Sequence, residues 1–248
     1  MSGFLVLWRR ELAGYFLSPV AYATLTFFLA VMGTIFYFLT GIMTSGVAGA
    51  TVMNLMFGSP FYWMTQMIVV PLLTMRLFAE ERRMGTIETL LTAPVSDAQV
   101  VAAKFAGVFS FYAFMWLPTL LFFVGLNFFS ANGLPLTAGV IIAAYLGVFL
   151  GGAMFLAIGL LCSLMTANQI IAAITCFAML MLVFFAGFIE FIAPFPRAQL
   201  LAELISPHHH LLEFSRGIVD TRAVVFYLTG TAFCLFTATR VLESRQWK

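Results

Sequence analysis

Two long segments of the sequence contain no Asp, Glu, Lys or Arg. The first runs from Leu12 to Met75 and the second from Phe105 to Ile189. A membrane-spanning helix needs only about 20 apolar residues, so each segment has room for several spans. The chain of 248 residues is 62% hydrophobic and 9% charged, which is too little charge to cover a water-soluble protein of this size. We therefore predict an all-α integral membrane protein.

Turn-forming residues divide the apolar sequence into six predicted membrane spans. A Ser-Ala-Asn-Gly turn follows the third span, and only residues 165–168 separate the fourth from the fifth, which predicts an antiparallel hairpin. Pro71 lies within the second span, where its missing N–H is expected to kink the helix. The spans cover about residues 20–39, 61–78, 105–129, 137–164, 169–189 and 223–239.

The residues before the first span predict an amphipathic helix that lies in the membrane interface. Apolar side chains, including Trp8, recur at helical spacing over residues 4–16, whereas Arg9, Arg10 and Glu11 are expected on the opposite face. A cleaved signal peptide is the competing interpretation. It is disfavoured because the charges follow the first apolar stretch and no small-residue cleavage site follows the span.

Lysine and arginine are distributed unequally over the two sides that six spans define. One side, which includes both termini, has nine of them, and the other side has three. Cytoplasmic loops carry the excess of positive charge, so we predict that both termini and the loop 76–104 are cytoplasmic. The loops 40–60, 130–136 and 190–222 are then outside. The nine are Arg9, Arg10, Arg76, Arg82, Arg83, Lys104, Arg240, Arg245 and Lys248, and the three are Arg197, Arg216 and Arg222.

Several classes of function lack support in the sequence. The two lysines, Lys104 and Lys248, do not follow the glycine spacing of a phosphate-binding loop, and there is no GxSxG serine motif. The net charge of +2 is not gathered into a basic patch, so nucleic acid is not an expected partner. Spans one, three and four contain no Asp, Glu, Lys or Arg, which argues against the alternative of an ion-coupled secondary carrier.

The nearest approach to a metal site is a histidine run in the last outer loop. His208, His210 and Glu213 would be the ligands of a membrane metallohydrolase, but the HExxH pattern is absent and further ligands would have to come from elsewhere. We interpret the run as a polar turn after Ser206 and Pro207 that leads into an interfacial helix. No metal site is predicted.

The loop after the second span has the most distinctive pattern. Ile87, Leu90 and Leu91 lie at helical spacing between Gly85 and Pro94, which predicts a short amphipathic helix suited to a groove on a cytoplasmic partner. The competing interpretation is an ordinary loop whose apolar stripe lies on lipid. Next, the spacing of Ser96, Asp97, Ala98 and Gln99 predicts a capping box, so the third helix is expected to begin before the membrane and to carry Lys104.

In this loop the sequence resembles the ABC-2 family of ABC-transporter permeases. The hallmark series of that family is matched by Glu80, Glu81, Gly85, Thr86, Glu88, Leu90, Leu91, Pro94 and Lys104. The resemblance extends to the interfacial N-terminal helix, the six spans and a C-terminal segment. Within that segment, residues 205–207, 214–220 and 242–247 are similar to the gliding-motility-type branch.

The resemblance implies that residues 1–248 form one transmembrane permease domain of an exporter in the inner or plasma membrane. Two such subunits, identical or different, pair in the lipid, and two copies of a separate cytoplasmic ATPase bind ATP and Mg²⁺ and drive export. The chain itself is then not an enzyme and binds no cofactor. In the family the inner-loop helix, here with Ile87, transmits the movement of the ATPase. The last outer loop, with Pro207, His208, Glu213 and Arg216, forms short helices that dip into the membrane.

Overall fold

The computed structural model describes residues 3–44, 52–86, 95–129, 137–187 and 204–244. Regular structure in these ranges is entirely helical, and six helices are long and apolar enough to cross a membrane. The prediction of an all-α membrane protein with six spans is therefore confirmed. The spanning helices are α2 (Pro19–Thr44), α4 (Pro60–Thr74) with its continuation into α5 (Ala79–Arg83), α7 (Asp97–Phe129), α8 (Ala138–Met165), α9 (Gln169–Ala186) and α13 (Thr221–Glu243).

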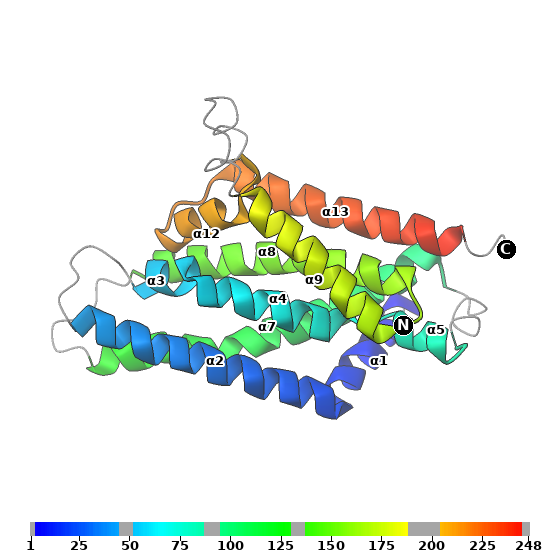
Figure 1. The fold of residues 1–248 in the computed structure, drawn as a ribbon, viewed down its shortest axis with the longest axis horizontal. Helices are drawn as coiled ribbons and strands as arrows, with labels where there is room; N and C mark the ends of the chain where they lie inside the picture. The colour runs from blue at the N-terminus through cyan, green and yellow to red at the C-terminus, as the bar shows by residue number, and fades with distance from the viewer. Residues whose placement is uncertain (1–2, 45–51, 87–94, 130–136, 188–203, 245–248) are drawn as a thin grey trace.

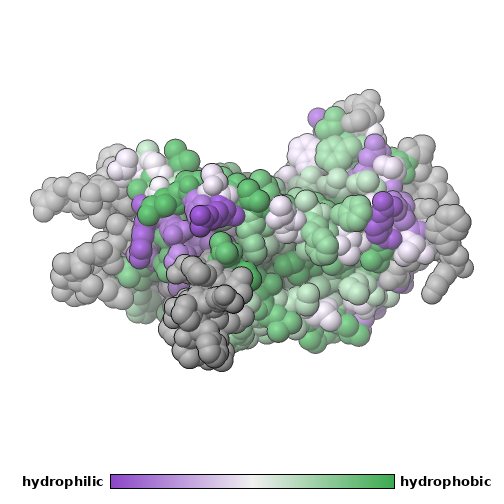
Figure 2. All heavy atoms as spheres, turned by 90° about the horizontal axis from the view of Figure 1, so that it is seen from above, coloured by the Kyte–Doolittle hydropathy of each residue, from purple (hydrophilic) through white to green (hydrophobic). Residues whose placement is uncertain are grey.

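The short helices gather at the two ends of the bundle. Helix α1 (Gly3–Leu17) lies at the same end as α5 and the C-terminal end of α13, whereas α3 (Val52–Gly58) and α12 (Pro207–Ser215) lie toward the opposite end (Figure 1). On the face seen in Figure 2, hydrophilic residues gather toward the two ends, and apolar residues cover the band between them. This distribution is the one that a bilayer requires.

Helix α2 is longer than the sequence predicts. Thr40 and Gly41 are expected to end the first span, but the helix continues through them to Thr44. The Thr40 hydroxyl donates a hydrogen bond to the Tyr37 carbonyl oxygen (2.8 Å), so this polar side chain is satisfied within the helix. Where water is scarce, a continuous helix satisfies the backbone better than a turn does.

Helix α3 lies in a segment that the sequence assigns to an outer loop. Its Met53, Met56 and Phe57 are fully buried, and the helix packs against α12 and α2. Seven residues are too few for a reliable helical pattern, so tertiary packing decides this segment. Helix α12, in contrast, is one of the short helices expected in the last outer loop. Ser206 caps it by accepting a hydrogen bond from the His209 N–H (3.2 Å).

Helix α8 is the centre of the bundle, because it contacts α13, α12, α9, α4 and α7. Three glycines allow these neighbours to approach its backbone: Gly147, Gly152 and Gly159, the last of which faces Thr74 of α4. A Cβ atom at Gly147 would lie 2.8 Å from the Phe214 ring on α12, and one at Gly152 would lie 2.7 Å from Cζ of Tyr112 on α7. The connection to α9 is the predicted hairpin, in which the Asn168 side chain accepts a hydrogen bond from the Ile170 N–H (2.9 Å).

We predict that Gly152→Ala destabilises the bundle by about 1–3 kcal/mol, because overpacking a buried contact displaces the larger side chain. Tyr112 is fully buried, and its hydroxyl donates a hydrogen bond to the Gln66 side chain (3.2 Å), which a displaced ring would strain. The matched control is Gly139→Ala in the same helix, where a Cβ atom meets nothing within 4 Å. Denaturation in mixed micelles, followed by circular dichroism, measures both free energies of unfolding. Equal stabilities of the two variants would contradict close packing at Gly152.

Candidate coupling site

The second span is interrupted near the α1/α5 end of the bundle. The sequence predicts one kinked helix over residues 61–78, but α4 continues only one turn past Pro71, to Thr74, and α5 begins at Ala79. Ser163 of α8 bridges this break. Its hydroxyl accepts hydrogen bonds from the N–H groups of Phe78 (3.1 Å) and Ala79 (3.2 Å) and donates one to the Met75 carbonyl oxygen (3.2 Å). One buried hydroxyl therefore satisfies three backbone groups of the turn.

Helix α5 is also tied to the C-terminal end of α8. The Arg82 guanidinium donates a hydrogen bond to the Leu164 carbonyl oxygen (2.7 Å), one of the last carbonyls of α8. A cation at this position also interacts favourably with the helix dipole. The five-residue helix α5 is too short to be stable alone, so these contacts hold it in place.

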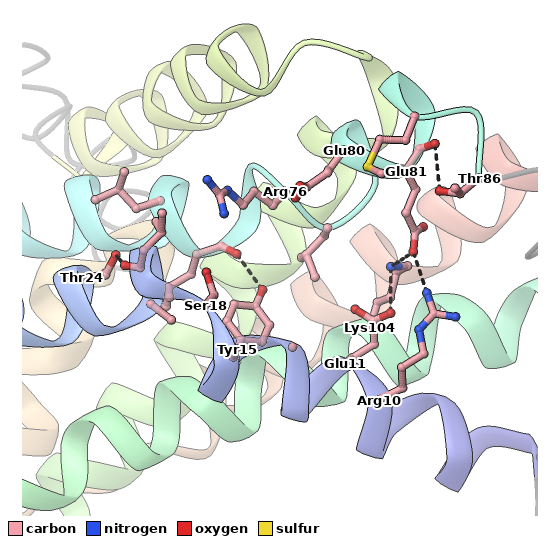
Figure 3. Close-up of a pocket in the computed structure, with 17 residues that line it drawn as sticks. Arg10, Glu11, Tyr15, Ser18, Thr24, Arg76, Glu80, Glu81, Thr86 and Lys104 are labelled. Atoms are coloured by element: carbon pink, nitrogen blue, oxygen red, sulfur yellow. Dashed lines mark hydrogen bonds and ion pairs between the residues drawn. The ribbon is translucent and has the colours of Figure 1, made fainter.

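Lys104 is the most buried charged residue in the described part of the chain, with 3% of its side chain exposed. Its ammonium group lies between two carboxylates, 2.8 Å from Glu81 Oε1 of α5 and 3.0 Å from Glu11 Oε1 of α1 (Figure 3). Arg10 approaches the same Glu81 oxygen at 3.5 Å, and the Phe78 ring centroid is 5.1 Å from Lys104 Nζ. We call Arg10, Glu11, Glu81 and Lys104 the ion-pair cluster. It joins three helices through one buried charge.

Helix α1 packs closely against α7, which corrects the prediction for Glu11. The sequence places this residue with Arg9 and Arg10 on the polar face, but Glu11 points toward α7 because Lys104 needs a counter-charge there. A Cβ atom at Gly107 of α7 would lie 2.8 Å from Glu11 Cβ, so only glycine permits this crossing. Trp8 adds a hydrogen bond from its indole N–H to the Ser110 hydroxyl (3.2 Å), whereas Arg9 is exposed.

Tyr15 connects the end of α1 to α4. Its hydroxyl donates a 2.7 Å hydrogen bond to the Leu73 carbonyl oxygen. Burial raises the pKa of Tyr15 far above its usual value, and the Glu11 carboxylate raises it further. The phenol therefore stays protonated and remains a donor at every physiological pH.

The predicted capping box at the start of α7 is confirmed. The Ser96 hydroxyl accepts a hydrogen bond from the Gln99 N–H, and the Gln99 side chain accepts one from the Ser96 N–H, each at 3.3 Å. Before the loop, Gly85 adopts a φ of +71°, and the Thr86 N–H donates to the Glu81 carbonyl oxygen (3.0 Å). The remaining predicted residues of this loop lie outside the described residues: Ile87, Glu88, Leu90, Leu91 and Pro94.

The residues predicted in the last outer loop do not converge on one point. His208 Nε2 lies 3.3 Å from the Gly58 carbonyl oxygen, and His210 is buried against the rings of Phe226 and Tyr227. Glu213 is instead 4.0 Å from His209. Pro207 is the first residue of α12, and Arg216 caps its C-terminal end. Within the described ranges, no three His, Cys, Asp or Glu side chains are placed to hold a metal ion.

A pocket of about 460 Å³ lies beside the ion-pair cluster. It lies between α1, the beginning of α2 and the α4–α5 turn (Figure 3). Glu80 and Arg76 line it, as do the apolar side chains of Val20, Leu72 and Leu73. Glu80 therefore lines the pocket without belonging to the ion-pair cluster, whereas its neighbour Glu81 does both.

The sequence alone does not predict the roles of Ser163 and Arg82. Ser163 is a single hydroxyl in a long apolar helix, and such a residue usually bonds within its own helix. The position of Arg82 in the sequence indicates only a positive charge beside the membrane. The one signal in the sequence is that both lie within two residues of a helix end, where backbone groups lack partners.

We predict that Lys104→Met destabilises the protein by about 3 kcal/mol, because it leaves the partly buried Glu11 without a cation and Glu81 with only the exposed Arg10. The triple variant Lys104→Met, Glu11→Gln, Glu81→Gln removes the uncompensated charge and should recover most of this loss. Free energies of unfolding in mixed micelles measure both effects.

The control for this prediction is Arg240→Met. Arg240 pairs with Glu243 at 2.8 Å, but its side chain is 64% exposed, so the change should be below about 0.5 kcal/mol. If Lys104→Met were as mild as Arg240→Met, the ion-pair cluster would not be holding the three helices together.

Comparison with known proteins agrees with this architecture. The family model described as "ABC-2 family transporter protein" matches residues 51–216, well over half of the chain, from α3 through Glu81 and Lys104 of the ion-pair cluster to α12. The comparison with curated proteins gave no match. Similarity to the gliding-motility-type branch stays a prediction. The extent of the family match, together with the six apolar helices, shows that the chain belongs to the ABC-2 transporter family and is a multi-pass membrane permease of an ABC transporter.

Proposed function

We propose that this chain is the permease subunit of an exporter in the inner or plasma membrane and that it is driven by separate ATPase subunits. Two permease subunits pair in the lipid, and two copies of a cytoplasmic ABC ATPase bind ATP and Mg²⁺. The match to the ABC-2 family over residues 51–216 carries this proposal. The sequence adds support, because neither lysine belongs to a phosphate-binding loop.

The α1/α5 end is proposed to face the cytoplasm. Nine of the twelve lysines and arginines belong to the side of both termini and of the loop 76–104. Since α1, α5 and the end of α13 share one end of the bundle, all three would be near a cytoplasmic partner (Figure 1).

The hallmark residues are proposed to divide into two groups. Lys104 is too buried to reach another subunit, so it acts with Glu81 and Glu11 as an internal brace. Ile87, Leu90 and Leu91 form the apolar stripe that contacts the ATPase, and Glu88 lies at its rim. The loop from Gly85 to Pro94 connects α5 to α7 in the chain, and these are two of the helices that the brace joins. A displacement of this loop by the ATPase is then transmitted to α1, α5 and α7 together.

The orientation is tested with single cysteines in a variant that lacks Cys162, Cys176 and Cys234. Cysteines introduced at Ser45, Asn132 and Gln199 should react with an impermeant thiol reagent in intact cells, whereas one at Met84, which is 68% exposed, should not. The Met84 cysteine should react after the membrane is permeabilised. Labelling of Met84 in intact cells would reverse the proposed topology.

The coupling proposal is tested by co-expressing the tagged chain with its cognate ABC ATPase. The isolated chain should hydrolyse no ATP, and the purified complex should. Leu90→Ala with Leu91→Ala should weaken ATPase association at least tenfold, because each truncation removes about 2 kcal/mol of buried apolar contact and about 1.4 kcal/mol is a factor of ten.

The matched control replaces Leu117 and Leu121 by Ala. These leucines of α7 are 55% and 68% exposed within a membrane span, so ATPase association should remain at the wild-type level. Equal co-purification of the ATPase with both double variants would support the competing interpretation, in which the stripe of the loop lies on lipid.

A further inference from the structure

The pocket beside the ion-pair cluster lies at the boundary between apolar and charged parts of the bundle. Its walls include Val20 and Ala21 at the beginning of one span and Leu72 and Leu73 near the end of another. The remaining walls come from the charged segments around Glu80 and from α1. The pocket has a volume typical of ligand sites, and its mixed apolar and charged walls suit an amphiphilic ligand such as a lipid headgroup with its chains.

The charges that line the pocket sum to zero. Three cations and three carboxylates take part: Arg10, Arg76, Lys104, Glu11, Glu80 and Glu81. Four of these six belong to the ion-pair cluster and compensate each other. Arg76 and Glu80 remain, one positive and one negative.

Neither Arg76 nor Glu80 has an ion-pair partner within 4.0 Å among the described residues. The Nε atom of Arg76 is buried and has no hydrogen-bond partner in the same part of the chain. Figure 3 shows both side chains apart from the ion-pair cluster, with no dashed line to either. Within the described ranges, Arg76 lines the pocket without a counter-charge, so a ligand that brings an anion to its guanidinium group would be bound favourably.

We propose that this pocket binds the headgroup of a zwitterionic phospholipid with a primary amine, namely phosphatidylethanolamine. The phosphate accepts hydrogen bonds from Arg76, and the ammonium group donates to the Glu80 carboxylate. The acyl chains lie toward Val20, Leu72 and Leu73. This inference goes beyond the proposed transport function and does not depend on it.

The choice among lipid headgroups follows from the two unpaired charges. Phosphatidylglycerol offers Arg76 a phosphate but offers Glu80 no cation, so its net negative charge faces a carboxylate. Phosphatidylcholine carries a quaternary ammonium, which cannot donate a hydrogen bond to Glu80. Only a headgroup with both a phosphate and an N–H donor pairs both side chains. Arginine also suits a phosphate better than a lysine would, because its donors are arranged as a fork.

The test measures binding of short-chain dihexanoyl lipids to the purified full-length chain in detergent, by titration calorimetry and without any ATPase. Dihexanoyl-phosphatidylethanolamine should bind at least tenfold more tightly than the matching glycerol and choline lipids. Glycerophosphoethanolamine, which lacks acyl chains, and inorganic phosphate should both bind much more weakly. Because no ATPase is present, the result is independent of the proposed coupling.

Single variants distinguish the proposed phosphate contact of Arg76 from the proposed ammonium contact of Glu80. Arg76→Gln should weaken binding of all three lipids about tenfold, whereas Glu80→Gln should weaken only the ethanolamine lipid, to the level of the glycerol lipid. Arg83→Gln is the matched control, because Arg83 is exposed on α5 and does not line the pocket. Thermal unfolding of each variant verifies that it is folded.

Three outcomes would overturn the proposal. The first is equal affinity of the wild-type chain for all three lipids, a comparison that requires no variant. The second is an equal effect of Arg76→Gln and Arg83→Gln. The third is inorganic phosphate binding as tightly as the ethanolamine lipid, which would assign the pocket to a free anion instead.

Discussion

The buried ammonium group of Lys104 constrains everything at the α1/α5 end of the bundle. Moving a lysine out of water costs several kcal/mol unless carboxylates replace the lost solvation. Helix α7 does not supply them, because it has no Asp or Glu beyond Lys104 and its one carboxylate, Asp97, lies seven residues before it. The carboxylates therefore come from α1 and α5, and both helices must be in place before the charge is compensated. An interfacial helix and a five-residue helix thus become fixed parts of the bundle.

The α1/α5 end also contains the break between α4 and α5, and neighbouring residues make this broken span tolerable. The turn between α4 and α5 exposes backbone groups, and at this depth they need partners from the protein. Ser163 supplies them from α8, and Arg82 returns a contact to the last turn of that helix. Helix α5 is therefore held from two sides, by α8 through hydrogen bonds and by α7 through Lys104.

Composition and helical periodicity were enough to predict the spans, the hairpin at Asn168 and the capping box of Ser96 and Gln99. These features depend on local sequence and on the bilayer. The inward direction of Glu11 was not predictable in the same way. Its helical position beside Arg9 and Arg10 indicates a polar face, and only the position of Lys104 in space reverses that assignment. Helix α3 was missed for a similar reason, because its burial under α12 is a tertiary contact.

The opposite end of the bundle is held by a different kind of contact. Phe214 of α12 packs on Gly147, and the hydroxyls of Thr119 and Tyr145 lie 2.6 Å apart in the core, so the contacts there are aromatic and neutral. Such close-packed contacts are short-ranged and resist sliding. The α1/α5 end is instead joined by the close packing of α1 on α7 and by the buried charge of Lys104, which is stable only while its carboxylate partners are in place. Helix α8 contacts both α5 and α12, so one continuous helix links the two ends of the bundle. A charge-dependent end and a neutral, close-packed end therefore share the same central helix.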